Sequence, residues 1–268
     1  MITLQRSFYI FLIFTIVSKI AAHAQQSNLA LAKAFYKFSY INDTTKRDQP
    51  VNKTMVLYMN KDASLFRNLM DEESKLLLYL SKGGSKSKFD ILEESASLIQ
   101  IADKTQRVER LIDNMYVISE GQKTIDWKLQ DETKKIGNYL AQKATAEISG
   151  RYYTVWFTQE IPFQFGPWKL KGLPGLILDA RDSRGEVIFE FDGFEMMKKE
   201  ELVKISVPKS FKIKKVSFGE FEKIYKSFYD DPITFSKASL GITDSKKVIN
   251  GNPSSSERKY NNPIEIRR

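Results

Sequence analysis

In the stretch GPWKLKGLPGLI, residues Gly166–Ile177, two prolines and three glycines stand among tryptophan, leucine and isoleucine side chains. Pro174 and Gly175 suit the two central positions of a type II turn, because proline fixes a negative φ and glycine accepts a positive one. A rigid turn between apolar residues predicts a connection that crosses a buried sheet and enters a strand at Leu176. The alternative is that Trp168 and the leucines line the mouth of an apolar cavity.

Strand-like segments rich in aromatic and β-branched residues lie on both sides of this stretch, separated by turn residues. We expect strands over residues 32–41, 54–59, 115–119, 124–129, 142–148, 151–158, 176–180 and 186–191, with another from 135 onward. Short connections such as Ser149-Gly150 favour antiparallel hairpins. The expected fold class is therefore mainly β (α+β), with a curved antiparallel sheet that forms a sandwich or a half-barrel.

The sequence also indicates a helix, which follows the last of these strands in the chain. Ser217 and Glu220 match a capping box at its start, and Pro232 follows its end at Asp231. Its apolar residues recur at helical spacing, at Phe221, Ile224, Tyr225 and Phe228. This pattern predicts an amphipathic helix packed on the core. Weaker signals indicate helices over residues 71–80 and 92–102.

The N-terminal end has the three parts of a secretory signal peptide. Arg6 precedes the apolar run Phe8–Val17, and Ala22-His23-Ala24 is a small-residue cleavage site. We expect a signal peptide over residues 1–24, one β-rich domain over 25–249 and a loosely ordered tail over 250–268. The apolar run is short for a membrane span, and cleavage would remove it, so no transmembrane span is expected in the mature chain. The alternative is that the segment is not cleaved and acts as an anchor. The chain is therefore expected to be exported from the cytoplasm.

The residue types that the sequence lacks limit which catalytic and metal-binding chemistry is expected. The sequence has no cysteine, and its one histidine, His23, lies in the expected signal peptide. The mature chain would therefore lack imidazole and thiol groups, so we expect no metal site, no cofactor and no histidine-dependent nucleophilic catalysis. The net charge is +9. For an exported chain this charge indicates anionic lipids, acidic polymers or a solvated surface, and no nucleic-acid partner is expected.

Carboxylates are the remaining candidates for catalysis. Asp179, Glu190 and Asp192 lie on adjacent expected strands and could face one another. A pair of acids at suitable separation hydrolyses glycosidic bonds, whereas acids on an outer face are commonly just solvated. The leading hypothesis is an exported cell-envelope binding or accessory protein without catalytic residues. It would hold an apolar small molecule or lipid, or dock on an outer-membrane transporter. The alternative is a carboxylate-dependent hydrolase of envelope glycans.

The candidate residues for ligand or partner binding cluster around the opening stretch. They are Trp156, Phe163, Phe165, Gly166, Pro167, Trp168, Gly172, Leu173, Pro174, Gly175, Leu176 and Ile177.

The hexapeptide Gly172–Ile177 reads GLPGLI, and other short matches accompany it. These are Gln142-Lys143-Ala144-Thr145, Gly150-Arg151, Tyr153, Val155-Trp156-Phe157-Thr158, Glu160-Ile161-Pro162, Gly166-Pro167-Trp168 and Asn262-Pro263-Ile264-Glu265. The chain resembles the GLPGLI family, exported proteins of Bacteroidetes-type bacteria. The resemblance implies a β-rich fold and a periplasmic or outer-membrane location, and it assigns no catalytic residue. Relatives often have a cysteine near Ala141, which this chain lacks.

Overall fold

The computed structural model describes residues 29–69, 97–101, 104–111, 114–121, 124–198, 201, 203–207, 213–241 and 262. The expected signal peptide over 1–24, the expected helix over 71–80 and the expected tail, apart from Asn262, lie outside these residues. No helix in the described part of the chain combines the length and the apolar character that crossing a membrane requires.

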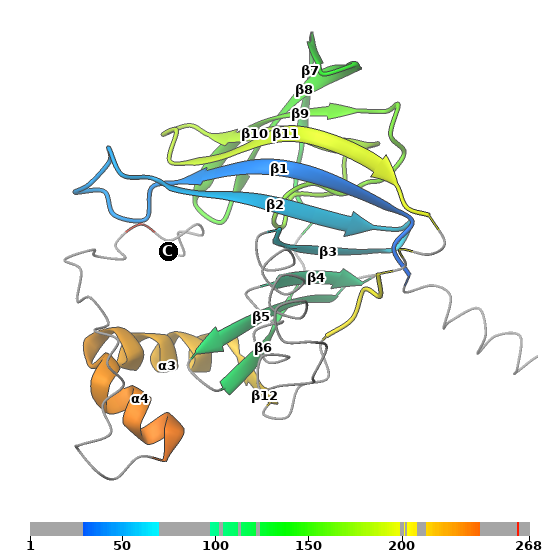
Figure 1. Ribbon diagram of the computed structural model, residues 1–268. Coiled ribbons are helices and arrows are strands. Elements are labelled where there is room, and N and C mark those ends of the chain that lie inside the picture. Colours follow the sequence, from blue (N-terminus) through cyan, green and yellow to red (C-terminus); the bar gives the residue numbers. More distant parts are fainter. Residues whose placement is uncertain are drawn as a thin grey trace, which may run out of the picture.

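Twelve strands form one open sheet, in the spatial order β12-β6-β5-β4-β3-β2-β1-β11-β10-β9-β8-β7 (Figure 1). The strands are β1 (Ala32–Tyr40), β2 (Val51–Met59), β3 (Ala63–Asn68), β4 (Ser97–Ile101), β5 (Lys104–Leu111), β6 (Asn114–Gly121), β7 (Lys128–Ile136), β8 (Tyr139–Ile148), β9 (Arg151–Thr158), β10 (Leu176–Asp182), β11 (Val187–Met196) and β12 (Ile213–Ser217). Neighbouring strands are antiparallel except β12, which runs parallel to β6. The mainly β prediction is confirmed, and the curved sheet is a single open layer of strands.

One face of the sheet, called here the inner face, carries the largest apolar core. Every second side chain of β1 packs in this core, and Tyr36 and Phe38 are among them. The connection from β9 to β10, residues 159–175 and called here the GLPGLI loop, packs on this core. It contributes Phe163, Phe165, Leu170 and Leu173. The loop therefore covers the inner face of the sheet, and burial of its apolar residues there stabilises this position.

Two helices follow β12, namely α3 (Phe218–Asp230) and α4 (Pro232–Leu240). The predicted capping box is present: Ser217 Oγ accepts from the Glu220 N–H at 3.3 Å, and Glu220 Oε2 accepts from the Ser217 N–H at 2.7 Å. Phe221 of α3 is buried against Tyr116 and Ile118 of β6. The predicted amphipathic helix packed on the sheet is therefore confirmed. Pro232 both ends α3 and begins α4.

The helix predicted over 92–102 is wrong where the structure describes that segment, because residues 97–101 form β4. Leu98 joins the core of the inner face, while Ile99 joins a second core on the opposite, outer face. A strand buried on both faces shows no alternation of apolar and polar residues, so its sequence resembles that of a buried helix.

Candidate functional site

The GLPGLI loop is fixed to the sheet by its own backbone. The Leu176 N–H donates to the Ile161 carbonyl at 3.0 Å, and the Ile177 N–H donates to the Phe165 carbonyl at 3.0 Å. The indole N–H of Trp127 adds a side-chain contact, at 2.9 Å from the Lys171 carbonyl. These bonds satisfy backbone groups that lie over an apolar surface, so the loop has a defined conformation.

The turn at Pro174 differs from the type II turn that the sequence predicted. The Gly175 N–H donates to the Leu173 carbonyl at 2.8 Å, which closes a tighter, three-residue turn around Pro174. In a type II turn the Leu176 N–H would donate to the Leu173 carbonyl. This bond is not formed because the Leu176 N–H donates to the Ile161 carbonyl instead. Gly175 has φ 146°, and a Cβ atom there would lie 1.9 Å from the Thr158 carbonyl oxygen. The close approach of two backbone segments thus requires glycine.

Most of the candidate binding residues are part of the core. Those that are buried are Phe163, Phe165, Gly166, Pro167, Leu173, Gly175, Leu176 and Ile177. Gly172 and Pro174 are exposed, and Trp156 and Trp168 are half-buried. Trp156 lies on the other side of β9 from Val155 and Phe157, beside Lys134, whose Nζ is 4.5 Å from its ring centroid. The structure therefore brings the loop residues together, and Trp156 packs against the same core from β9, outside the loop.

Trp168 is the candidate with an unusual backbone. Its φ is 56°, in the left-handed region that residues with a side chain rarely adopt. Such a conformation costs roughly 1–3 kcal/mol, and strained residues of this kind cluster at functional sites. The ring is half-buried against the core of the inner face, and Lys169 Nζ lies 5.6 Å from its centroid.

A cluster of charged residues lies beside Trp168, and sequence reasoning missed it. This cluster, called here the inner-face ion cluster, consists of Arg107, Glu109, Glu120 and Lys169. Arg107 Nε is 3.5 Å from Glu109 Oε1 and 3.9 Å from Glu120 Oε1, and Lys169 of the GLPGLI loop forms an ion pair with Glu120. Burial raises the pKa of the Glu109 carboxyl, against the opposing effect of Arg107. The residues come from β5, β6 and the loop, so no local pattern could have indicated the cluster.

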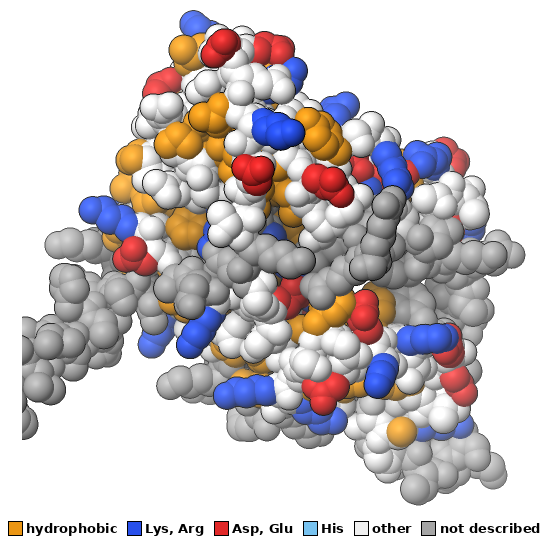
Figure 2. All heavy atoms as spheres, turned by 180° about the vertical axis from the view of Figure 1, so that it is seen from behind, with side chains coloured by type: hydrophobic (Ala, Val, Ile, Leu, Met, Phe, Trp, Pro, Cys, Tyr) orange, Lys and Arg blue, Asp and Glu red, His pale blue; other side chains and the backbone are white. Residues whose placement is uncertain are grey.

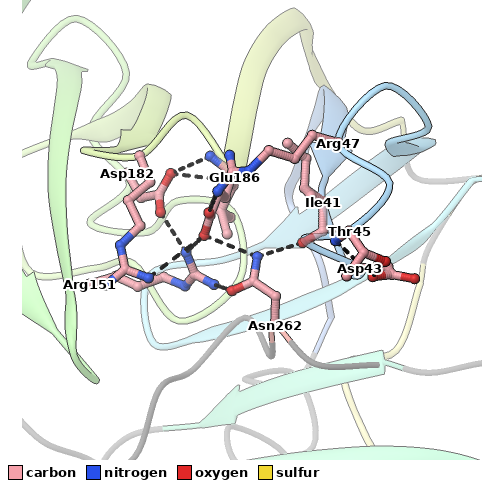
Figure 3. A network of polar contacts seen from close by, with 10 residues as sticks. Ile41, Asp43, Thr45, Arg47, Arg151, Asp182, Glu186 and Asn262 are labelled. Carbon is pink, nitrogen blue, oxygen red and sulfur yellow. Dashed lines mark hydrogen bonds and ion pairs between the residues drawn. The ribbon is translucent and has the colours of Figure 1, made fainter. Parts of the chain in front are cut away.

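A second polar cluster ties several strand ends together (Figure 3). Arg151 Nη1 lies 2.5 Å from Asp182 Oδ2 and 3.1 Å from Glu186 Oε2. Arg47 also forms an ion pair with Glu186. Asp182 Oδ1 accepts from the backbone N–H groups of Glu186 and Val187, at 2.7 and 3.0 Å. Because the buried charges have partners, this cluster holds β9, β10 and β11 in register.

Asn262, within the expected tail, completes this second cluster. Its Oδ1 accepts from Arg151 at 2.6 Å, and its Nδ2 donates to the Ile41 carbonyl at 2.6 Å and to Glu186 Oε2 at 3.0 Å. Its carbonyl accepts from the Tyr40 hydroxyl. Burial would raise the pKa of Glu186, but the hydrogen bonds from Arg151, Asn262 and Arg47 outweigh this effect and hold the pKa below the usual value. The tail is thus anchored at one described residue, which is 4% exposed.

Replacing Asn262 with alanine is expected to lower the free energy of unfolding by about 2 kcal/mol, because Arg151 and Glu186 would each lose a hydrogen-bond partner in a buried site. Urea denaturation followed by circular dichroism measures the change. Asn52, an exposed residue of β2, supplies the matched control. Asn52→Ala should stay within about 0.5 kcal/mol of the original chain. Equal stability of the two variants would contradict the anchoring role.

The acids considered for hydrolysis have separate basic partners. Asp179 Oδ2 lies 3.3 Å from Lys134 Nζ, and Asp179 Oδ1 accepts from the Phe191 N–H at 3.0 Å. Glu190 Oε1 is 3.8 Å from Arg181, and Asp192 Oδ1 is 2.9 Å from Lys37. Among the described residues, these acids are therefore parts of three separate ion pairs.

Charges of both signs are interspersed over the side of the molecule turned away in Figure 1. Figure 2 shows basic and acidic side chains next to one another there, with apolar side chains between them. On the described part of this side, the net charge of +9 is not gathered into one basic patch.

Comparisons with known proteins find a family that shares the sequence signature and structures that share the fold. The model of a family described as "Protein of unknown function (Porph_ging)" matches residues 149–179, which include the GLPGLI hexapeptide. The resemblance to the GLPGLI family is confirmed over this segment. No curated protein matches the sequence.

Two structures of PNGF-II, in the P21 and C2 space groups, are similar in fold, with a TM-score of 0.51 and sequence identities of 15% and 16%. Each match covers 72% of this chain and 32% of PNGF-II, so this chain spans about a third of the length of that protein. An uncharacterized conserved protein from Thermus thermophilus has a TM-score of 0.37 and 10% identity, over 75% of this chain and 99% of its own. At 15–16% identity, the similarity to PNGF-II shows the fold alone.

Proposed function

We propose that this chain, with its GLPGLI signature, is an exported, non-catalytic binding protein of the cell envelope. It holds an apolar small molecule or lipid at the inner face of its sheet, next to Trp168. The observation that carries the proposal is the conformation of Trp168: its backbone has φ 56°, and its ring lies half-buried beside the inner-face ion cluster. Folding retains such strain where the surrounding structure over-determines it, which is typical of ligand sites.

Two further observations support a binding role. Asp179, Glu190 and Asp192 each have a separate basic partner, which favours solvated ion pairs over a catalytic pair of acids. In PNGF-II, the part that is similar to this chain makes up 32% of the protein. A fold that forms part of a larger protein is compatible with an accessory role.

Export is supported by the sequence of residues 1–24, with its basic start, apolar core and Ala22-His23-Ala24 site. Mass spectrometry of the protein purified from its native envelope tests this part of the proposal. We expect a chain that begins at Gln25. A chain that retains residues 1–24 would contradict cleavage at this site.

The same preparation tests binding. Native mass spectrometry is expected to detect a co-purifying apolar or amphipathic molecule on the original chain. Trp168→Gly, which removes the ring and relieves the backbone conformation, is expected to lose most of that molecule. Trp156→Ala is the control, because Trp156 is also half-buried against the same core but lies on β9, outside the GLPGLI loop.

Absence of any bound molecule from all three proteins, with no thermal stabilisation by a panel of lipids, would overturn the binding proposal. Recovery of an outer-membrane transporter in a pull-down, without a bound small molecule, would indicate that this chain binds a protein partner and not a small molecule.

A further inference from the structure

We propose that the second polar cluster, around Arg151, is a peptide-recognition site specific for asparagine. The chain's own Asn262 occupies it, and a separate peptide that carries the same asparagine binds it in trans. The inference is independent of the molecule proposed at the inner face, because the residues that contact Asn262 lie outside the GLPGLI loop. It follows from the complete hydrogen bonding of Asn262 and from contacts that hold the site in place without it.

The site binds the side chain of Asn262 as a primary amide. The Arg151 guanidinium donates to Oδ1 at 2.6 Å, while the Ile41 carbonyl and Glu186 Oε2 accept from Nδ2 at 2.6 and 3.0 Å (Figure 3). A primary amide has an acceptor oxygen and two N–H donors, and the site supplies the complementary donor and two acceptors. A carboxylate has no N–H to donate and would place a negative charge beside Glu186. The site therefore distinguishes asparagine from aspartate.

The backbone of the same residue is bound as well. The Asn262 N–H donates to the Asn42 carbonyl at 3.2 Å, and the Asn262 carbonyl accepts from the Tyr40 hydroxyl. These two contacts fix the distance from the backbone to the partners of the amide. Because Asn262 is buried, the longer side chain of glutamine would displace its amide from those partners. The site therefore also distinguishes asparagine from glutamine.

Contacts that do not involve Asn262 hold the site together. Arg151 Nη1 pairs with both Asp182 and Glu186. Arg47, in the connection from β1 to β2, pairs with Glu186 from the other side. Asp182 Oδ1 in turn accepts from the backbone N–H groups of Glu186 and Val187. A site whose groups are already in place loses little conformational entropy on binding, so its ligand need not belong to the same chain.

The covalent connection gives Asn262 an advantage over a separate peptide. Asn262 follows the end of α4 at Leu240 by 22 positions (262 − 240). A ligand tethered in this way is present at its site at an effective concentration of about a millimolar. A separate peptide therefore competes poorly in the original chain and binds more tightly once the tethered asparagine has been replaced.

Fluorescence anisotropy of a labelled peptide of residues 259–266, KYNNPIEI, tests the inference. The receptor is the full chain with Asn262→Ala, which keeps Arg151, Ile41 and Glu186 but lacks the amide that they bind. We expect this receptor to bind the peptide at least about tenfold more tightly than the original chain does, because Asn262 competes in the original chain.

Peptides that carry Asn262→Asp or Asn262→Gln are the matched controls. Each is expected to bind the same receptor at least about tenfold more weakly than the asparagine peptide, as the loss of a hydrogen bond to a buried charged group implies. In the receptor, adding Tyr40→Phe removes a donor to the peptide backbone and should weaken binding about fivefold. Tyr152→Phe is the control for this change, because Tyr152 is an exposed residue of β9.

If the Asn262→Ala chain does not accumulate as folded protein, its refolding in the presence of each peptide gives the readout. The asparagine peptide is then expected to raise the yield of folded chain, and the aspartate peptide is not. Equal effects of the three peptides, in binding or in refolding, would overturn the specificity for asparagine. No effect of any peptide would overturn recognition in trans. Native mass spectrometry tests the molecule at the inner face separately, so the two proposals can fail independently.

Discussion

A chain with Gly175→Ala is expected to lose more than about 4 kcal/mol of unfolding free energy, or to fail to accumulate as folded protein. The new Cβ atom would lie 1.9 Å from the carbonyl oxygen and 2.7 Å from the carbonyl carbon of Thr158. Both atoms belong to backbone at the end of β9, so relief requires β9 and the GLPGLI loop to separate. The backbone φ of 146° adds to the cost for any residue other than glycine. Urea denaturation of the purified variant measures the loss.

Gly172→Ala provides the matched control within the same hexapeptide. Gly172 also has a positive φ, 92°, but a Cβ atom there would have no heavy atom within 4 Å. Only the backbone conformation is then unfavourable, and we expect a loss of about 1–2 kcal/mol. If both variants were destabilised equally, the close contact with Thr158 would not explain the first glycine requirement.

Arg151→Met is expected to lower the free energy of unfolding by about 3–5 kcal/mol, the usual cost of removing one partner from a buried ion pair. The side chains of Arg151, Asp182 and Glu186 are each 1% exposed. Methionine fills much of the space but leaves two carboxylates next to each other without their shared cation. Arg47 would still contact Glu186, and Asp182 would keep its two backbone N–H donors.

The adjacent strand offers a control of the same chemistry. Arg181 pairs with Glu190 at 3.8 Å, but these side chains are 60% and 57% exposed. Arg181→Met should therefore change stability by less than about 0.5 kcal/mol. A similar loss in both variants would indicate that burial of the charges is not the cause.

The same contacts predict a dependence on pH. The folded state holds the pKa of Glu186 below its ordinary value of 4.5. The associated stability is therefore fully present above that value and is lost as the pH falls through the lower pKa of the folded state. In Arg151→Met the carboxylate has lost one of its donors, so stability should fall less steeply on acidification. A denaturation series from pH 7 downward compares the two slopes.

Local patterns were sufficient for much of the fold. The strand expected over residues 32–41 and the capping box of α3 depend on neighbouring residues, and both predictions are confirmed. The strand β4 was missed because Leu98 and Ile99 are buried on opposite faces. The turn at Pro174 was only partly predicted, because the Leu176 N–H donates to the Ile161 carbonyl outside the turn, and no short-range signal reports that contact.

The candidate site was harder to predict for a related reason. Aromatic residues near the GLPGLI hexapeptide suggested a binding surface, yet Phe163 and Phe165 are core residues. Arg107 and Lys169 are separated by 62 positions (169 − 107) and become neighbours only through the order of the strands. Likewise, the composition around Asn262 is polar and gives no sign that this one side chain is buried.

The anchoring of Asn262 has a consequence for the timing of assembly. Its partner Tyr40 precedes it by 222 positions, so a growing polypeptide presents the receiving strands long before the asparagine has been synthesised. Contacts between such distant positions form slowly. Among the described residues, the buried contacts of Asn262 are therefore the last for which the chain supplies its partner. A polypeptide interrupted upstream of this position would lack the hydrogen bonds of Asn262 to Arg151, Ile41 and Glu186 and is expected to be less stable.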